Sequence, residues 1–177
     1  MNLVEHAKAF AIERHGGQQR KYTGEPYWYH LRNVAEILTK LGCHPVLIAA
    51  AWLHDCLEDT ETKAVELEEH FGPEVYDLVF ALTDFASTSV NRATRKAMDR
   101  RRLAASSPPA QTIKLADLID NTASIVKHDP DFARVYLDEK EKLLLVLTRG
   151  EPALIKRAWE TLIDGQRALV QHALGGK

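Results

Sequence analysis

Apolar residues recur at steps of three and four along most of the chain, which is the spacing of one buried face of an α-helix. In the opening segment, for example, Leu3, Ala7, Phe10 and Ala11 fall on one side. No stretch of useful length alternates apolar and polar residues as a half-buried strand does. The pattern therefore predicts an all-α fold, a compact bundle of about eight or nine helices.

Turn-forming and capping residues mark where these helices are expected to begin and end. Thr60 or Thr62 is expected to cap a short helix that ends near Gly72, and Pro73 is expected to begin the next one. Residues 85–91 are polar and are predicted to form a loop. Further helices are predicted over residues 3–15, from His30 to Leu41, from Pro45, from Arg92 to Arg102, from Pro108, over 132–148 and over 152–173.

Composition places these helices in one domain, residues 1–177, with 45% apolar residues for its core. The net charge of −2 gives no general field that attracts nucleic acid, and no polybasic run marks a membrane-surface segment. The N-terminus lacks a signal-peptide pattern, and no window approaches ~18 uninterrupted apolar residues. Cys43 and Cys56 form no CxxC pair, and we interpret both as small apolar residues that fill space in the core. We therefore expect a cytoplasmic protein that binds neither nucleic acid nor membrane.

A cluster of metal-binding and proton-carrying side chains follows the apolar run Ile48–Leu53. Its residues are His54-Asp55-Cys56-Leu57-Glu58-Asp59. On a continuing helix, His54 and Glu58 lie one turn apart, as do Asp55 and Asp59, so all four crowd one end of a rod. An imidazole beside a carboxylate is a common part of a divalent metal site, and further carboxylates can order and deprotonate water. The alternative is a solvated helix end that is merely acidic.

Two residues elsewhere in the chain are candidates to join this cluster. Asp117 lies in the apolar segment Ile113–Ile119, where a buried carboxylate needs a cation or hydrogen-bond donors. His30 stands at the head of a predicted helix. With His54 and Asp55 they make a set of two imidazoles and two carboxylates, which suits manganese, zinc or iron.

Taken together, the motifs resemble those of the HD-domain metal-dependent phosphohydrolases. More narrowly, they are similar to the hydrolase domain of the bacterial (p)ppGpp-metabolising enzymes and to its stand-alone relatives, the small alarmone hydrolases. The matching segments are His15 with Gly17–Lys21, Gly24–Tyr27 with His30, Ala50–Thr60 with its HDxxED signature, and Ile113–Asp117 with Asn121. The chain departs from the family at Leu31, where proline is common, and at Tyr22, an insertion relative to some longer enzymes.

This resemblance implies a metal-dependent pyrophosphohydrolase. Its metal, expected to be Mn²⁺, would be held by four ligands, His30, His54, Asp55 and Asp117. Glu58 and Asp59 would hold or deprotonate the attacking water. The expected substrate is a guanosine or adenosine alarmone such as (p)ppGpp, which loses its 3′-diphosphate as pyrophosphate and leaves a nucleoside 5′-di- or triphosphate.

The resemblance also implies a binding site for this nucleotide. Arg20 and Lys21 are expected to hold it, and the Arg20 guanidinium can stack flat on the base. Asn121 and Ser124 lie on the helix stripe that carries the metal ligand of that segment, and they are expected to bond the ribose or the base edge. For Ser124, an ordinary helix serine is an equal alternative.

For three further features two interpretations stay open. Lys114 either meets a phosphate or neutralises Asp117. Tyr136 either closes the nucleotide pocket or packs in the core. The basic segment Arg92–Arg102 is either a solvated helix face or the border of an anionic substrate, whereas Tyr27 is expected to be scaffold.

Two rival functions remain on sequence grounds. One is a broader HD phosphohydrolase that acts on an adenine-type alarmone, on NADPH or on a 5′-nucleotide. The other is a nucleotide-binding sensor without turnover. Intact Glu58 and Asp59 favour an enzyme over a sensor, because a pure binder has no need of both.

Overall fold

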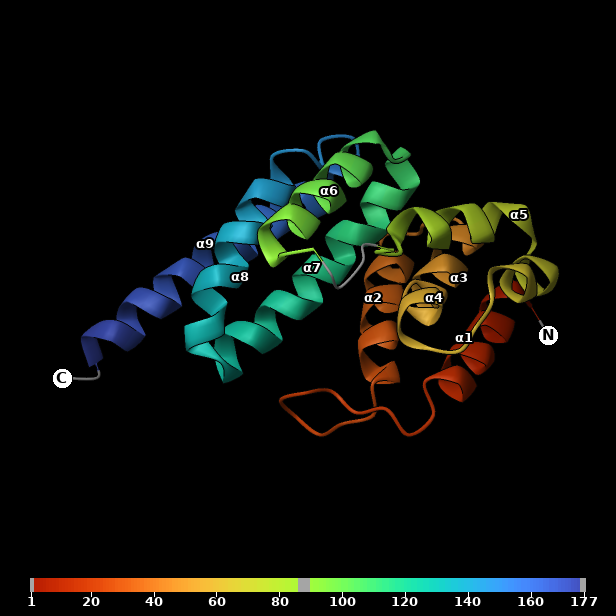
Figure 1. Ribbon diagram of the computed structural model, residues 1–177, viewed down its shortest axis with the longest axis horizontal. Helices are drawn as coiled ribbons and strands as arrows, with labels where there is room; N and C mark the ends of the chain where they lie inside the picture. The colour runs from red at the N-terminus through yellow and green to blue at the C-terminus, as the bar shows by residue number, and fades with distance from the viewer. Residues whose placement is uncertain (1, 86–89, 176–177) are drawn as a thin grey trace. The chain divides into compact units, whose positions relative to one another are not determined.

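The computed structural model describes residues 2–85 and 90–175, and within them it contains nine α-helices and no β-strand (Figure 1). The helices are α1 Leu3–Arg14, α2 Trp28–Lys40, α3 Pro45–Leu53, α4 Cys56–Asp59, α5 Ala64–Leu82, α6 Arg92–Ala105, α7 Pro108–His128, α8 Pro130–Leu144 and α9 Pro152–Gly175. The predicted all-α fold is confirmed. Of the predicted loop over residues 85–91, residues 86–89 lie outside the described residues. In the part of the chain described, none of the helices has the length and apolar character needed to cross a membrane.

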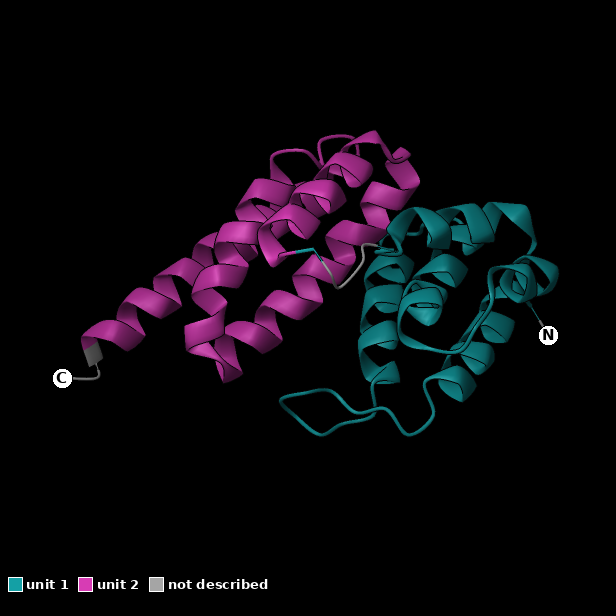
Figure 2. Ribbon diagram, in the orientation of Figure 1, with its two compact units in different colours: residues 1–90 teal, residues 91–177 magenta. Residues whose placement is uncertain are grey.

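The chain divides into two compact units, Met1–Val90 and Asn91–Lys177 (Figure 2). In unit 1, α3 packs against α1, α2 and α5. The apolar run Ile48–Leu53 is buried on every side of α3, as expected for a helix that is hydrophobic all round. Pro45 starts α3 at its first turn, where a missing N–H carries no penalty. The end of this buried helix therefore leads directly into the HDxxED motif, whose His54 and Cys56 are buried as well.

Unit 2 is built around α7, which packs against α8 and α9. Ser107 caps α7 by accepting a hydrogen bond from the Ala110 N–H, and Pro108 occupies its first turn. A Cβ atom at Gly165 of α9 would lie 3.1 Å from Val126 and 3.2 Å from Leu137, so glycine allows α9 to approach both neighbours closely. Asp117 of α7 lines one pocket together with residues of α6 and α8.

Two predicted helix boundaries have different outcomes. The break at Gly72-Pro73 is confirmed as a kink inside α5, where Gly72 has φ 78° and ψ 169°. The predicted cap by Thr60 or Thr62 is wrong, because α5 begins after Lys63 without a side-chain cap. The Thr60 hydroxyl instead donates to the main-chain oxygen of Cys56 and lies 2.7 Å from the Thr62 hydroxyl.

Candidate functional site

The HDxxED motif lies on a turn and not on a continuous helix. α3 ends at Leu53, and the one-turn helix α4 begins at Cys56, so the predicted single helix through the motif is wrong. The Nδ1 atom of His54 lies 2.7 Å from the main-chain oxygen of Ala51, which assigns the proton to Nδ1. The Nε2 atom of His54 is then the acceptor nitrogen, and it lies 3.1 Å from Oδ2 of Asp55.

A second imidazole approaches the same carboxylate oxygen. His30, buried in the first turn of α2, places its Nε2 atom 3.7 Å from Oδ2 of Asp55. The ring centres of His30 and His54 are 5.3 Å apart. Two imidazole nitrogens and one carboxylate oxygen thus converge on one small space, a mixed nitrogen and oxygen donor set that fits a divalent ion such as manganese, zinc or iron. Three of the four predicted ligands therefore come together in unit 1.

Tyr27 is tied to this centre in a way that sequence reasoning missed. Its hydroxyl donates a 2.7 Å hydrogen bond to Oδ2 of Asp55, the oxygen that faces both imidazoles. Its ring stacks on His15, with ring centres 5.1 Å apart. Tyr27 is scaffold, as predicted, but it holds a candidate ligand directly, as the outer partners of metal sites commonly do.

His15 links the loop before α2 to the motif. It is fully buried, with Nδ1 2.8 Å from Oε1 of Gln18 and Nε2 3.7 Å from the sulfur of Cys56. Gln18 in turn donates to the main-chain oxygen of Asp59, 2.7 Å away. Burial lowers the pKa of His15 and raises the pKa of the Cys56 thiol, so a neutral imidazole donates to Gln18 and accepts from the thiol.

The two predicted proton carriers lie on α4, the turn that follows His54 and Asp55 in the chain. Glu58 accepts a 3.0 Å hydrogen bond from the main-chain N–H of Asp84. Partial burial raises the pKa of Asp59, and the nearby Asp55 carboxylate raises it further. Both line a polar hollow of unit 1, together with Glu13, Arg14, Gln18, Thr60 and Glu61. A carboxyl group with a raised pKa at such a place is suited to exchange protons with a bound water or leaving group.

The basic loop residues Arg20 and Lys21 also belong to unit 1. The main-chain N–H of Arg20 donates to the carbonyl of Glu25, and the N–H of Gly24 donates to the carbonyl of Arg20. These bonds fold the loop into a hairpin. The Nζ atom of Lys21 lies 4.8 Å from the centre of the Tyr22 ring. Their role in holding a nucleotide stays a prediction.

The fourth predicted ligand, Asp117, lies in the middle of α7 in unit 2. Its Oδ2 atom accepts a 2.7 Å bond from Nζ of Lys114, and its Oδ1 atom accepts from the side-chain amide of Asn121. Lys114, Asp117 and Asn121 therefore form one stripe along the helix, at steps of three and four. The ion pair fits the predicted neutralisation of Asp117 by Lys114. Ser124 is half-buried one turn further on, and its main-chain oxygen accepts from Nδ1 of His128.

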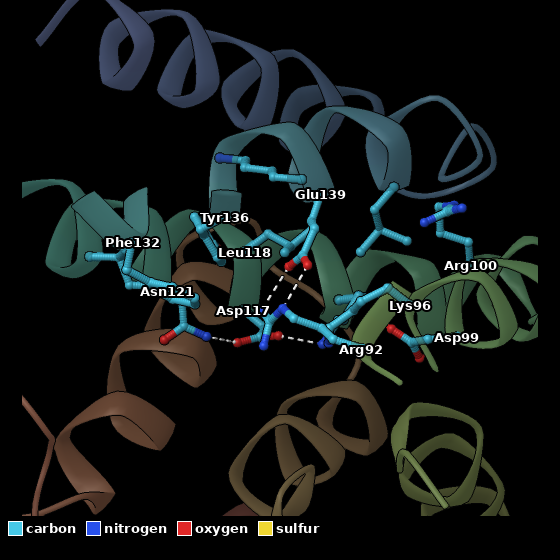
Figure 3. A pocket seen from close by; sticks show the side chains of 14 residues that line it. Arg92, Lys96, Asp99, Arg100, Asp117, Leu118, Asn121, Phe132, Tyr136 and Glu139 are labelled. Atoms are coloured by element: carbon cyan, nitrogen blue, oxygen red, sulfur yellow. Dashed lines mark hydrogen bonds and ion pairs between the residues drawn. The ribbon is translucent and has the colours of Figure 1, made fainter. Parts of the chain in front are cut away.

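A pocket of about 320 Å³ lies within unit 2, along the Asp117 stripe (Figure 3). Arg92, Lys96 and Arg100 of α6 line it, which favours the second interpretation of the basic segment, as a border for an anion. Arg92 donates two hydrogen bonds to the Glu139 carboxylate, 2.7 and 2.8 Å long. The predicted substrate residues that line this pocket are Lys114, Asn121 and Tyr136.

Comparison with known proteins places these features in a family. The HD domain family matches residues 7–143. A guanosine-3′,5′-bis(diphosphate) 3′-pyrophosphohydrolase of Aquifex aeolicus is 40% identical over 125 residues, which are 69% of this chain and 18% of that enzyme. The corresponding MESH1 enzyme of Homo sapiens is 38% identical over 132 residues, 73% of this chain and 72% of the enzyme.

A solved structure is similar along nearly the whole chain. It is that of a metazoan ortholog of SpoT described as hydrolysing ppGpp, with a TM-score of 0.84 and 30% identity over 96% of this chain and 97% of the other. By contrast, the chain spans less than a fifth of the length of the Aquifex enzyme. The chain belongs to the HD domain family, among the relatives of the guanosine-3′,5′-bis(diphosphate) 3′-pyrophosphohydrolases.

Proposed function

We propose that this protein is a metal-dependent 3′-pyrophosphohydrolase of guanosine or adenosine alarmones of the (p)ppGpp type. The observation that carries the proposal is the convergence of His30 and His54 on Oδ2 of Asp55, with the carboxylates of Glu58 and Asp59 on the following turn. The Aquifex and human relatives support this reaction, because both are named 3′-pyrophosphohydrolases.

The proposed metal ligands are His30, His54 and Asp55 of unit 1 and Asp117 of unit 2. All four fall inside residues 7–143, which match the HD domain. Mn²⁺ is the proposed ion, by the resemblance of the motifs. When bound, a divalent ion supplies positive charge that makes water more acidic and offsets the charge of a diphosphate.

Glu58 and Asp59 are the proposed proton carriers. One of them takes a proton from the attacking water, whose oxygen forms a bond to the phosphorus attached to the ribose 3′ oxygen. The bond between that phosphorus and the 3′ oxygen breaks, and pyrophosphate leaves. A proton returned to the 3′ oxygen completes the balance, and the raised pKa of Asp59 suits this acid step.

The substrate is proposed to meet cations at both ends. In the unit 2 pocket, Lys96, Arg100 and Lys114 offer positive charge to phosphate oxygens. In unit 1, Arg20 and Lys21 offer a stacking surface and a charge to the base and its 5′-phosphates. Asn121 and Ser124 remain the candidates for binding the ribose or the base edge.

We also propose a cytoplasmic location, because Cys43 and Cys56 form no CxxC pair and fit a reducing compartment.

Separate incubations with ppGpp, ppApp and GTP test this function. We expect metal-loaded protein to release pyrophosphate from at least one 3′-diphosphate and to lose that activity on addition of a chelator. Orthophosphate release from GTP would instead support a broader phosphohydrolase. Tight nucleotide binding without any release would support a sensor.

Two variants test the proposed proton carriers. We expect Glu58→Ala and Asp59→Ala to keep the fold and the metal but to lose turnover, by about 10²-fold or more. His54→Ala is the matched comparison, because it is expected to lose the metal. Full activity in both carboxylate variants would show that these roles are wrongly assigned.

A further inference from the structure

Unit 2 contains a buried lysine, and lysine is one of the residue types that are least often buried. Lys140 of α8 is only 1% exposed and lines the pocket described above. Its Nζ atom donates to the hydroxyls of Thr122 and Thr161, both 2.7 Å away. Because both partners are neutral, burial dominates and lowers the pKa of Lys140 to about 7. A side chain so unfavourable to bury calls for a role.

The hydroxyl protons of both threonines are donated to main-chain oxygens of their own helices. Thr122 donates to the main-chain oxygen of Leu118, and Thr161 donates to that of Ala158, 2.9 Å away. A hydroxyl has one proton to donate and two lone pairs. Both threonines therefore accept from Lys140, and the direction of each hydrogen bond is determined.

The direction of the Thr122 hydrogen bond also determines which way Tyr136 donates. Its hydroxyl oxygen lies 3.3 Å from the hydroxyl oxygen of Thr122. Because the Thr122 proton goes to Leu118, Tyr136 must be the donor. Burial raises the pKa of Tyr136, so its hydroxyl keeps this proton. The phenolic oxygen then has only lone pairs left for a ligand and acts as a hydrogen-bond acceptor.

A second acceptor lies on the same stretch of the pocket. The side-chain nitrogen of Asn121 donates one of its two protons to Asp117, and the amide oxygen of Asn121 is an acceptor. Figure 3 shows Asn121 and Tyr136 near one end of the pocket and Lys96 and Arg100 near the other. The pocket is thus polarised, with acceptors at one end for hydroxyl or N–H groups and cations at the other end for phosphates.

We propose that Lys140 and Thr122 are positioning residues that hold Tyr136 as an acceptor, and that Tyr136 recognises the ribose 2′-hydroxyl of the substrate. This inference rests on the proposed function. In a nucleoside 3′-diphosphate the 2′-hydroxyl is borne by the carbon next to the one that carries the reacting group. It is the nearest donor to the site of cleavage, whereas the phosphate oxygens are acceptors and cannot pair with Tyr136.

The test compares guanosine 3′,5′-bis(diphosphate) with its 2′-deoxy analogue. For each, kcat/KM is measured by pyrophosphate release with the metal-loaded protein. Kd is measured by calorimetry in the metal-loaded Glu58→Ala background, which is expected to keep the metal but to lose turnover. We expect the wild type to favour the ribonucleotide by roughly tenfold, the value of one well-formed hydrogen bond. Tyr136→Phe removes the acceptor, so this preference should fall to near unity.

Two further variants separate positioning from structure. Thr122→Val breaks the connection between Lys140 and Tyr136 and should lower the preference, whereas Thr122→Ser keeps the hydroxyl and should retain it. Lys140→Met should lower the preference as Thr122→Val does. A merely structural role would weaken both nucleotides equally and leave their ratio unchanged.

The outcomes distinguish this inference from the proposed function. Equal kcat/KM for the two nucleotides in the wild type and equal Kd in the Glu58→Ala background would overturn the inference and leave the hydrolase intact. A tenfold preference in Kd without pyrophosphate release would support recognition of the ribose and contradict the hydrolase. A preference that persists in Tyr136→Phe would overturn the assignment to Tyr136.

Discussion

At the scale of single residues, one oxygen atom organises the unit 1 part of the site. Oδ2 of Asp55 lies 3.1 Å from Nε2 of His54 and 3.7 Å from Nε2 of His30, and it accepts the Tyr27 hydroxyl. A hydrogen bond to a ligand carboxylate restricts its rotation and tunes its charge. We therefore expect Tyr27 to act on metal affinity without being a ligand.

We expect Tyr27→Phe to weaken binding of Mn²⁺ by about tenfold, the lower end of the range for outer partners of metal ligands. Titration calorimetry of the metal-free protein measures this directly. Tyr29→Phe is the matched control, since the Tyr29 ring packs against Trp28 and Arg32. Equal affinity in the Tyr27 variant and the wild type would show that the hydrogen bond does not position Asp55.

Lys140 makes stability depend on pH. Its pKa is about 7 in the folded protein and near the ordinary value of 10.5 in the unfolded chain. Between these two values the unfolded chain binds more protons, so the free energy of unfolding rises with pH across this window and loses that gain as pH falls to about 7. The stabilising form is the neutral amine.

We expect Lys140→Met to raise the free energy of unfolding at pH 7 by roughly 1 kcal/mol, because a methionine of similar length is cheaper to bury. The variant should also lack the rise in stability above pH 7. Urea denaturation at pH 7 and at pH 9.5 checks both. A variant less stable than the wild type at pH 7 would contradict this account of the buried amine.

Sequence reasoning identified the candidate ligands but not these two supporting residues. His54, Asp55 and Asp117 stand out because polar groups interrupt apolar runs, where burial demands a partner. Lys140 lies in the charged segment Asp138–Lys142, which has the composition of a solvated helix face. Its burial depends on packing among α7, α8 and α9, which no local pattern encodes.

At the scale of elements, the main difference between sequence and structure is the break after Leu53. The motif contains no glycine or proline that would break a helix, so local reasoning favours one rod. In the structure the main-chain N–H of Asp59 donates to the carbonyl of Asp55, 2.8 Å away, and a new turn begins there. The Nδ1–H group of His54 donates to the main-chain oxygen of Ala51 in the last turn of α3. After this break the His54 imidazole faces the Asp55 carboxylate, with Nε2 and Oδ2 3.1 Å apart.

The kink inside α5 can be predicted from the sequence. Glycine commonly ends a helix, and proline is common in the first turn of the next one, so Gly72-Pro73 marks a break. With φ 78° and ψ 169°, Gly72 occupies a region that essentially only glycine adopts. Outside its chain neighbours and the nearby backbone of α5, no described atom lies within 4 Å of a Cβ added there, so backbone strain is what opposes a side chain.

We therefore expect Gly72→Ala to lower the free energy of unfolding by about 1 to 3 kcal/mol. Chemical denaturation measures the loss, and Glu74→Ala, at an exposed position on the same turn, is the control. An unchanged midpoint for Gly72→Ala would mean that the kink can relax into a conformation open to alanine.

At the scale of the whole molecule, the proposed ligands are divided between the two units. The HD domain match runs from residue 7 to residue 143 and so includes residues of both. Helical periodicity predicts the helices, in a single domain, but says nothing about which polar residues share an ion. The order of the HDxxED motif and the segment Ile113–Asp117 with Asn121 supplied that expectation, through the resemblance to a family.

The number and affinity of bound Mn²⁺ ions in Asp117→Ala test the central claim most directly. We expect the wild type to bind one ion per chain, and Asp117→Ala to lose affinity by about 10²-fold or more, as His54→Ala does. Asp120→Ala, one turn from Asp117 on α7, should bind like the wild type. Wild-type affinity in Asp117→Ala would contradict the assignment of Asp117 as a ligand of the ion that His54 is expected to hold.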